Sequence, residues 1–367
     1  MSRKLKILIS GGGTGGHIFP ALSIANELKR RLPDTEFLFV GADNRMEMER
    51  VPAAGYKIIG LPVRGLIRKL TFANFYVLRD YFKSLRRARL IVKEFKPDVA
   101  VGVGGYASAP VIKAASSLGV PCLLQEQNSY AGVTNKILSR RAKKICVAYD
   151  QMERFFPKEK IILTGNPVRP MPINQDLKRE ALVHFGIQTT NPVLFIMGGS
   201  LGARTINEAL LAATDKLGEE AVEVIWQTGK YYYENIKTQL DAKNLKNIHV
   251  MDFVSRMDLA YNVADLIVSR AGAISLSELC LVGKPSLLVP SPNVAEDHQT
   301  KNAMALVHAG AALMVPDNKA VNDLIPTALQ TIKDTARLEQ LGSNALKLAR
   351  PKATETIVDE LLSLIKV

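Results

Sequence analysis

Cysteines and long apolar runs are scarce in this 367-residue sequence. The three cysteines, Cys122, Cys146 and Cys280, are far apart and odd in number, so we expect neither a disulfide framework nor a zinc site. We interpret them as buried thiols in a reducing compartment. No uninterrupted apolar stretch approaches the ~20 residues that a membrane span requires, and no small-residue cleavage site follows the N-terminus. A cytoplasmic protein without a secretory signal is therefore expected.

Asp-x-Asp pairs are absent as well. Mg²⁺ or Mn²⁺ held by carboxylates usually requires such hard oxygen ligands close together, so we expect no metal and no other cofactor. A bound diphosphate would then have to be stabilised by helix dipoles, backbone N–H groups and cationic side chains.

Basic residues exceed acidic ones by 48 to 35, which gives a net charge of +13. A charge of this size favours an anionic partner, such as nucleic acid, anionic lipid or a polyphosphate substrate. The length is sufficient for two domains, and the apolar fraction of 47% is that of a globular protein with real cores.

Short apolar runs of strand character alternate with helix-like segments along the whole chain. They are residues 7–9, 37–40, 99–103, 122–124, 144–147 and 161–163, then 193–197, 223–227, 248–251, 266–269 and 286–289. Most lack a period of two, as expected for strands buried on both faces. The alternation predicts two doubly wound α/β domains with parallel sheets, whose glycine loops would line a cleft between them.

A segment rich in proline and glycine, residues 165–172, is the predicted linker. We therefore predict an N-terminal domain over 1–165 and a C-terminal domain over 166–349. The last segment, about 350–367, has a helical apolar face, and we expect it to pack back on the first domain.

A glycine loop, Gly11–Gly16, follows the first predicted strand and precedes a predicted helix. Such a turn lets backbone N–H groups approach a phosphate, and the helix dipole favours negative charge there. His17 adds a group that can move a proton near neutral pH. The loop also satisfies the dinucleotide pattern G-x-G-x-x-G. That pattern expects an acidic residue about 20 positions later, at the end of the second strand. The candidate, Asp43, lies later than expected.

Residues 64–93 combine cations with apolar residues at helical spacing. Nine positions are basic and only Asp80 is acidic, while Phe72, Phe75, Leu78, Phe82 and Leu85 recur at intervals of three and four. The pattern predicts an amphipathic helix, either packed on a core with a solvated basic face or docked on anionic lipid. Nucleic acid is disfavoured because no nucleic-acid module accompanies the segment.

Polar residues follow the predicted strand that ends near Leu124, where α/β proteins bind ligands. Glu126 could act as a base and Asn128 could bind a sugar hydroxyl or amide; the alternative is a polar loop with a helix cap near Ser129.

A second candidate spans Ser269–Glu278, where Gly272 and small residues open a predicted helix whose N–H groups could bind a diphosphate. Glu278 could accept hydrogen bonds from both ribose hydroxyls, or simply place a favourable charge in the first helical turns. Further on, Gln299 is the residue of a polar run that we expect to contact a ligand.

Seven motifs occur in order along nearly the whole chain: GGGTGGHIFPAL, GVGGYASAP, QEQNSYAGVTNK, GNPVR, GGSLGARTIN, SRAGAISLSE and EDHQTKNA. Together they closely resemble the MurG family, the bacterial glycosyltransferases of peptidoglycan synthesis. The resemblance implies a GT-B fold with an acceptor- and membrane-binding N-terminal domain and a C-terminal domain for the UDP-sugar. It implies transfer of N-acetylglucosamine from UDP-N-acetylglucosamine to the 4-hydroxyl of MurNAc in lipid I, with inversion, to form lipid II.

The resemblance also assigns residues and partners. Its sugar-nucleotide contacts correspond to Thr14, Gly15, Gly16, Asn128, Arg169, Ser200, Val254, Ala273, Ile274, Ser275, Leu276, Ser277, Glu278 and Gln299. Its membrane patch corresponds to Phe72, Phe75, Leu78, Arg79, Phe82, Lys83 and Arg86. It implies peripheral attachment to anionic lipid on the cytoplasmic face of the plasma membrane, with other cell-wall synthesis and division proteins as further candidate partners. His17 is the first candidate for the general base and Glu126 the second.

Three rival functions remain open at this stage. A UDP-sugar 2-epimerase would share the fold and the donor but would need no lipid acceptor. An NAD-dependent oxidoreductase would need a ribose-binding acid at the end of the second strand. A non-enzymatic scaffold docked on lipid would explain residues 64–93 but would leave the glycine loops, His17 and Glu278 unused.

Overall fold

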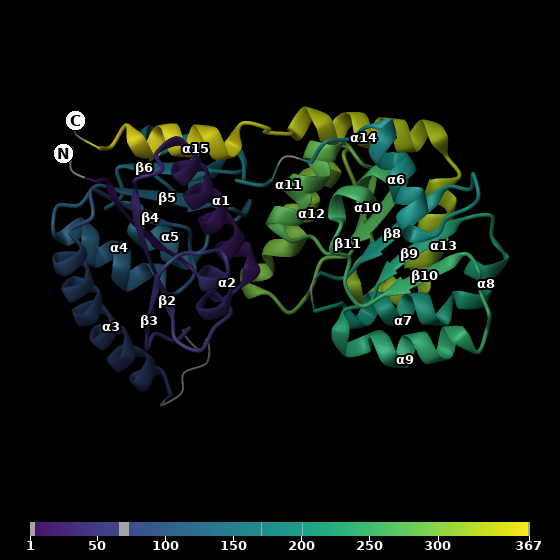
Figure 1. The fold of residues 1–367 in the computed structure, drawn as a ribbon, viewed down its shortest axis with the longest axis horizontal. Helices are drawn as coiled ribbons and strands as arrows, with labels where there is room; N and C mark the ends of the chain where they lie inside the picture. Colours follow the sequence, from purple (N-terminus) through teal and green to yellow (C-terminus); the bar gives the residue numbers. More distant parts are fainter. Residues whose placement is uncertain (1–3, 66–72, 170, 200, 366–367) are drawn as a thin grey trace. The chain divides into compact units, whose positions relative to one another are not determined.

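The computed structural model describes residues 4–65, 73–169, 171–199 and 201–365. The chain forms two compact units, an N-terminal unit of residues 1–169 and 350–367 and a C-terminal unit of residues 170–349 (Figure 1). The N-terminal unit extends beyond Gly165 because the next residue, Asn166, is buried in it. The Asn166 side chain accepts a hydrogen bond from Gln125 Nε2 at 3.0 Å and donates one to the Gln127 carbonyl at 3.1 Å.

The N-terminal unit is built on a seven-stranded sheet whose neighbouring strands all run parallel. Its strands are β1 (Lys6–Ser10), β2 (Glu36–Ala42), β3 (Ile58–Leu61), β4 (Val99–Gly102), β5 (Cys122–Glu126), β6 (Lys144–Val147) and β7 (Ile161–Leu163), in the order β3-β2-β1-β4-β5-β6-β7. Its helices are α1 (Gly15–Arg31), α2 (Glu47–Ala53), α3 (Ala73–Phe95), α4 (Ser108–Ser117), α5 (Val133–Leu138) and α15 (Ala353–Leu362), with short 3-10 turns at Met152–Arg154 and Lys158–Lys160.

Both faces of this sheet are buried, which explains the missing alternation in its strands. Leu8 of β1 belongs to the core cluster that also holds buried residues of α3 and α4. Its neighbours Ile7 and Ile9 belong to a second cluster with α1 and α15. Every residue of such a strand meets apolar side chains, so the sequence is continuously apolar.

The C-terminal unit repeats the plan with a six-stranded parallel sheet, ordered β10-β9-β8-β11-β12-β13. Its strands are β8 (Val193–Met197), β9 (Glu223–Gln227), β10 (Ile248–Met251), β11 (Leu266–Ser269), β12 (Ser286–Leu288) and β13 (Leu313–Met314). Its helices are α6 (Gln175–Phe185), α7 (Arg204–Ala212), α8 (Thr214–Glu219), α9 (Lys230–Asp241), α10 (Met257–Val263), α11 (Ala273–Val282), α12 (His298–His308), α13 (Ala320–Ile332) and α14 (Thr335–Leu348), with 3-10 turns at Ala295–Asp297 and Asp317–Lys319. The two doubly wound units expected from the sequence are confirmed.

Each sheet contains one point where the strand order reverses. In the N-terminal unit β1 pairs with β2 on one side and with β4 on the other. In the C-terminal unit β8 pairs with β9 and β11 in the same way. Connections leave in opposite directions at such a point, so a crevice opens at the carboxyl ends of the two central strands. The loops after β1 and β4, and those after β8 and β11, are therefore the places for ligands.

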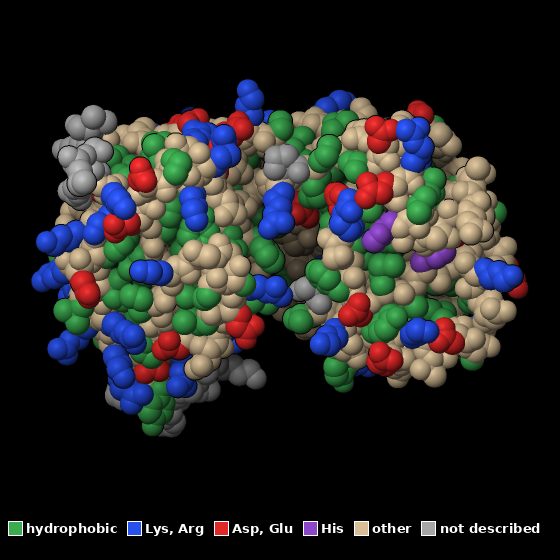
Figure 2. All heavy atoms as spheres, viewed as in Figure 1, with side chains coloured by type: hydrophobic (Ala, Val, Ile, Leu, Met, Phe, Trp, Pro, Cys, Tyr) green, Lys and Arg blue, Asp and Glu red, His purple; other side chains and the backbone are tan. Residues whose placement is uncertain are grey.

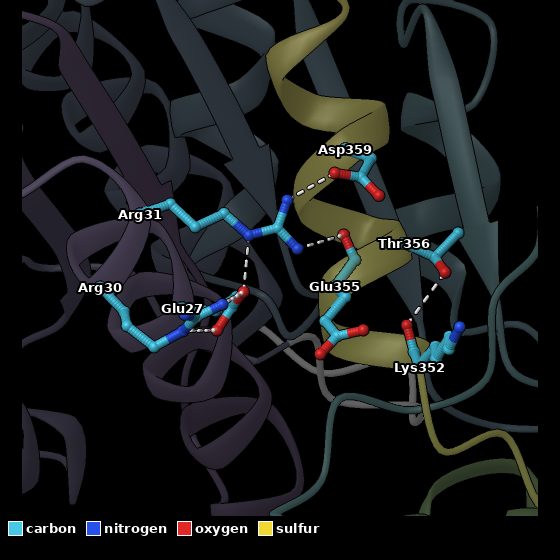
Figure 3. A network of polar contacts seen from close by, with 7 residues as sticks. All are labelled: Glu27, Arg30, Arg31, Lys352, Glu355, Thr356 and Asp359. Carbon is cyan, nitrogen blue, oxygen red and sulfur yellow. Dashed lines mark hydrogen bonds and ion pairs between the residues drawn. The ribbon is translucent and has the colours of Figure 1, made fainter.

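The C-terminal helix α15 packs on α1 of the N-terminal unit, as Figure 1 shows. Its apolar face, including Ile357, Val358 and Leu361, is buried in the same cluster as α1. A polar network lies beside this apolar contact (Figure 3). Glu27 accepts hydrogen bonds from Arg30 Nε at 2.8 Å and from Arg31 Nε at 2.6 Å. Arg31 also forms an ion pair with Asp359 of α15. A chain segment more than three hundred residues from α1 is thus held on it.

The Glu27 network predicts a pH-dependent stability. The hydrogen bond from Arg30, together with that from Arg31, lowers the pKa of Glu27 from 4.5 to about 2, although burial acts in the opposite direction. A lowered folded-state pKa contributes stability that is present above pH 4.5 and is lost as the pH falls towards 2. Glu27→Gln should therefore lower the thermal unfolding midpoint at pH 6, and its difference from the wild type should shrink between pH 4.5 and pH 3. Exposed Glu94→Gln is the control; a difference that is constant with pH would contradict the assignment.

Candidate functional site

The first glycine loop joins β1 to α1 by a close backbone contact with the loop after β4. A Cβ atom on Gly105 would lie 2.4 Å from the Gly12 carbonyl oxygen, and one on Gly11 would lie 2.1 Å from Val103 Cγ2. Gly13 has a φ of +89°, a conformation that side chains disfavour. The two loops can approach each other only because these positions are glycine.

His17 lies in the first turn of α1 and is half-buried. Its Nδ1 is 3.2 Å from the hydroxyl of Thr14, the residue that precedes the helix in an extended conformation. The opposite edge of the ring faces the second loop, since a Cβ atom on Gly104 would be 3.0 Å from His17 Nε2. The predicted contact residues Thr14, Gly15 and Gly16 lie beside His17, between β1 and the first turn of α1, at the reversal of strand order. Thr14 and Gly16 are exposed and Gly15 is half-buried.

Glu126 ends β5 and is only 2% exposed. Its carboxylate accepts hydrogen bonds from Asn135 Nδ2 at 2.9 Å, from Gly132 N at 3.1 Å, and from the backbone N and side-chain Nδ2 of Asn128 at 3.2 and 3.3 Å. Burial raises the pKa of Glu126, while these hydrogen bonds act to lower it. All these donors come from the loop and helix that follow, so the carboxylate holds the segment from Asn128 to Asn135 together.

The C-terminal unit contains a cavity of about 730 Å³ at its own reversal of strand order. The loop after β8 and the start of α7 line it with residues 197–199 and 201–205, and the loop after β11 lines it with residues 269, 270 and 272. Ser275 of α11, Ser291, Asn293, and Gln299 of α12 complete much of the remaining wall. This volume suits a nucleotide-sized ligand.

An ion pair forms one side of this cavity. Arg270 pairs with Asp317 and donates to the carbonyl oxygens of Val289 at 3.1 Å and Pro290 at 3.2 Å. Asp317 also accepts a hydrogen bond from the Thr205 hydroxyl at 3.0 Å. The Arg270 charge is thus balanced within the wall, and a bound diphosphate would rely on helix N-termini and backbone N–H groups.

The predicted donor contacts on α11 lie in different environments. Gly272 precedes the helix without a side-chain cap, and Ser275 lines the cavity. Ala273 and Leu276 are buried, so only their backbone could serve a ligand, and Ile274 is half-buried. The Ser277 hydroxyl donates to the Ala273 carbonyl at 3.0 Å, and Glu278 accepts from Tyr261 Oη at 3.1 Å.

Other predicted contacts are engaged within the protein. Val254 is 2% exposed, and its N–H donates to Gln227 Oε1 at 2.9 Å. Gln299 lines the cavity and accepts from the Ser291 N–H at 2.8 Å. Arg169 is exposed at the end of the N-terminal unit, and Ser200 lies outside the described residues.

Sequence reasoning missed several residues of the cavity, notably Arg204, Thr205, Glu208, Tyr232 and Asp317. Arg204 and Thr205 could have been found, because they open helix α7 directly after the glycine-rich loop of residues 198–202. Asp317 could not, because 47 residues separate it from Arg270 and no local pattern marks it.

Helix α3 carries the predicted membrane patch. Leu78 and Phe82 are more than half exposed, and Arg79, Lys83 and Arg86 are exposed beside them. Leu85 was expected on the same apolar face, but it is buried in the core with Ala88 and Val92. The predicted apolar face is thus exposed at Leu78 and Phe82 and buried further along the helix, and Figure 2 shows basic side chains spread over this unit. Phe72 and the side chain of Phe75 lie outside the described residues.

Metal-binding clusters and membrane-spanning helices are both absent from the residues that the structure describes. Within residues 4–65, 73–169, 171–199 and 201–365, no three His, Cys, Asp or Glu side chains are grouped so that they could hold a metal ion. In the same ranges, no helix combines the length and the apolar character needed to cross a membrane.

Two parallel-sheet units, each with a glycine loop and a helix start at its reversal of strand order, define a glycosyltransferase of the GT-B fold. Residues 7–147 match the family model for the glycosyltransferase family 28 N-terminal domain. Residues 193–357 match the model for the glycosyltransferase family 28 C-terminal domain. The chain belongs to glycosyltransferase family 28.

Individual relatives agree with this assignment. The chain is 57% identical to the UDP-N-acetylglucosamine–N-acetylmuramyl-(pentapeptide) pyrophosphoryl-undecaprenol N-acetylglucosamine transferase of Parabacteroides distasonis, over 99% of both chains. The crystal structure of MurG from Acinetobacter baumannii matches with a TM-score of 0.79 and 30% identity, over 98% of this chain and 100% of the other. A UDP-GlcNAc 2-epimerase from Neisseria meningitidis, bound to UDP-GlcNAc, shares only the fold, at a TM-score of 0.66 and 16% identity over 98% and 100%.

Proposed function

We propose that this chain transfers N-acetylglucosamine from UDP-N-acetylglucosamine to the 4-hydroxyl of MurNAc in lipid I, with inversion at the anomeric carbon, and so forms lipid II. The observation that carries the proposal is similarity over the full length, above 50% identity, to enzymes whose names state this sugar and this undecaprenyl-linked acceptor. The cavity of the C-terminal unit supports it, because its position and size suit a sugar nucleotide.

The donor is assigned to the C-terminal unit. Its diphosphate would meet the N-termini of α7 and α11 and the glycine loop before α7, where helix dipoles favour negative charge. Glu278 would accept hydrogen bonds from the ribose, and Gln299 would contact the sugar. As the bond from the anomeric carbon to the phosphate oxygen breaks, UDP leaves with the electron pair, and these groups stabilise its charge without a metal ion.

The acceptor is assigned to the N-terminal unit. The loop of residues 11–16 would hold its pyrophosphate, and His17 would take the proton from the 4-hydroxyl as that oxygen forms its bond to the anomeric carbon. Thr14 supports this role, because its hydroxyl orients the imidazole through Nδ1. The buried position of Glu126 and its full set of local donors favour a role in shaping the loop that carries Asn128.

Two rival functions lose support. Membership of the glycosyltransferase family removes the basis for an NAD-dependent oxidoreductase. The epimerases resemble this chain only in fold, whereas the transferases resemble it along its whole sequence.

Sugar transfer can be measured directly. Labelled UDP-N-acetylglucosamine and a lipid I analogue in detergent, without added metal, should yield a labelled disaccharide-lipid and an equal amount of UDP. If UDP-N-acetylglucosamine is bound or epimerised but no lipid product forms, the chain is an epimerase or a scaffold.

The base can be identified in the same assay. His17→Ala should reduce turnover by ~10²–10⁴-fold and remove the decline in rate at acidic pH, because the imidazole must be neutral to accept the proton. His184→Ala, at an exposed position on α6, is the matched control. Glu126→Gln should reduce turnover while the acidic decline persists. If neither variant loses at least about tenfold, the assignment of both residues is wrong.

We further propose that α3 docks the protein on anionic lipid at the cytoplasmic face of the membrane. Leu78 and Phe82 would enter the interface, while exposed Lys83, Arg86, Arg87 and Arg89 would face the headgroups. Four cations at ~1 kcal/mol each would increase partitioning by about 10³-fold.

Binding to vesicles tests this docking. The double variant Leu78→Ser/Phe82→Ser should bind vesicles containing anionic phospholipid at least about tenfold more weakly, because it removes two apolar groups from the interface. Val183→Ser removes an exposed apolar side chain of the C-terminal unit and should change nothing. Equal binding by the double variant would contradict the proposed insertion of this helix face.

A further inference from the structure

A buried carboxylate lies directly beneath the first glycine loop and has no part in the mechanism described above. Glu47 is the first residue of α2 and is 1% exposed. It follows the loop after β2 and lies 34 residues from Gly13 in the sequence. Burial of an ionisable side chain next to a candidate anion site is costly unless the group is well satisfied, so its partners indicate what it does.

The partners of Glu47 are backbone N–H groups of the glycine loop and of the end of strand β2. The N–H of Gly13 donates to both carboxylate oxygens, at 3.1 Å to Oε1 and 3.0 Å to Oε2. The N–H of Ala42, at the end of β2, donates to Oε1 at 3.0 Å. Glu47 therefore ties the middle of the glycine loop to the neighbouring strand of the sheet.

The surrounding glycines form a slot for this side chain. A Cβ atom on Gly12 would lie 2.0 Å from Glu47 Oε1, and one on Gly41 would lie 2.6 Å from Glu47 Cγ. Tyr106 packs against the loop from elsewhere, since a Cβ atom on Gly13 would be 3.2 Å from Tyr106 Cε1. The Glu47 carboxylate thus fixes the peptide bond between Gly12 and Gly13. The ring of Tyr106 limits the space at the α-carbon of Gly13.

We propose that Glu47 is a positioning residue of the transferase, which fixes the peptide of Gly13 and thereby the direction of the loop. Gly13 holds a φ of +89°, one of several conformations open to glycine, and the charged hydrogen bonds select it. The N–H of Gly13 points toward Glu47 and is not available to a ligand. The first backbone N–H groups of α1 have no hydrogen-bond acceptor within the helix, so these groups would meet the anionic acceptor substrate. The same loop leads into α1 and so sets the position of His17 in the first turn. This inference rests on the proposed function.

Three variants test the proposal. Glu47→Ala removes every acceptor, Glu47→Gln keeps the shape but leaves one oxygen, and Glu49→Gln is the control at an exposed position of the same helix. Amide hydrogen exchange of the segment 11–17 measures the hold on the loop without any substrate. It should accelerate by about tenfold or more in Glu47→Ala, less in Glu47→Gln, and not in Glu49→Gln.

Kinetics then tests whether this hold serves the reaction. The kcat/KM for the lipid I analogue should fall by about tenfold or more in Glu47→Ala and by a smaller factor in Glu47→Gln. The affinity for UDP, which the C-terminal unit is proposed to bind, should stay within about twofold of the wild type.

Each contrary result has a distinct meaning. Unchanged exchange in both Glu47 variants overturns the proposal, as does faster exchange with an unchanged kcat/KM. A parallel loss of UDP affinity and transfer would reveal general destabilisation and would also overturn it. If Glu47→Ala does not fold, Glu47→Gln decides by the same criteria. A wild-type protein that transfers no sugar would refute the proposed function, while the exchange comparison would still show whether Glu47 holds the loop.

Discussion

The reversal of strand order in each parallel sheet is the constraint on which the rest of the structure depends. At β1 and β4, and again at β8 and β11, neighbouring strands send their connections in opposite directions. The loops after β1 and β4 meet at the carboxyl ends of these strands. Each loop must therefore turn tightly. Glycine at Gly11 and Gly105 allows the first pair to touch, and the Cβ distances show that larger residues would collide.

In these crevices we expect the positive potential to come mainly from backbone N–H groups at helix N-termini, because the charged side chains named below are paired. In the C-terminal unit, Arg270 is paired with Asp317, so in the proposed function the N-termini of α7 and α11 would attract the diphosphate. In the N-terminal unit, the N–H of Gly13 donates to Glu47, so in the proposed function the start of α1 would meet the acceptor's pyrophosphate. If UDP binds in this way, helix starts would stabilise the charge that develops on it as it leaves.

Elements with a strong local pattern were predictable from the sequence, and elements set by tertiary contacts were not. All eleven predicted strands exist, since each contains a short apolar run, and most of these runs are buried on both faces. The edge strands β3 and β13 were missed, because β3 contains Gly60 and β13 has only two residues. Leu78 and Leu85 lie seven residues apart and so on the same face of α3, yet only Leu85 is buried, since helical periodicity identifies an apolar face but not how far along the helix the core covers it. Of the candidate site, the glycine loops and helix starts are contiguous motifs and could be located, whereas Asp317 and Glu47 reach their partners only through the fold.

The structure of the protein in complex with UDP tests most directly whether the chemistry occurs at the reversals of strand order. The account predicts the diphosphate at the start of α11, beside the loop between β8 and α7, with the ribose at Glu278. A UDP molecule bound instead to the loop of residues 11–16, with the cavity of the C-terminal unit unchanged, would contradict it.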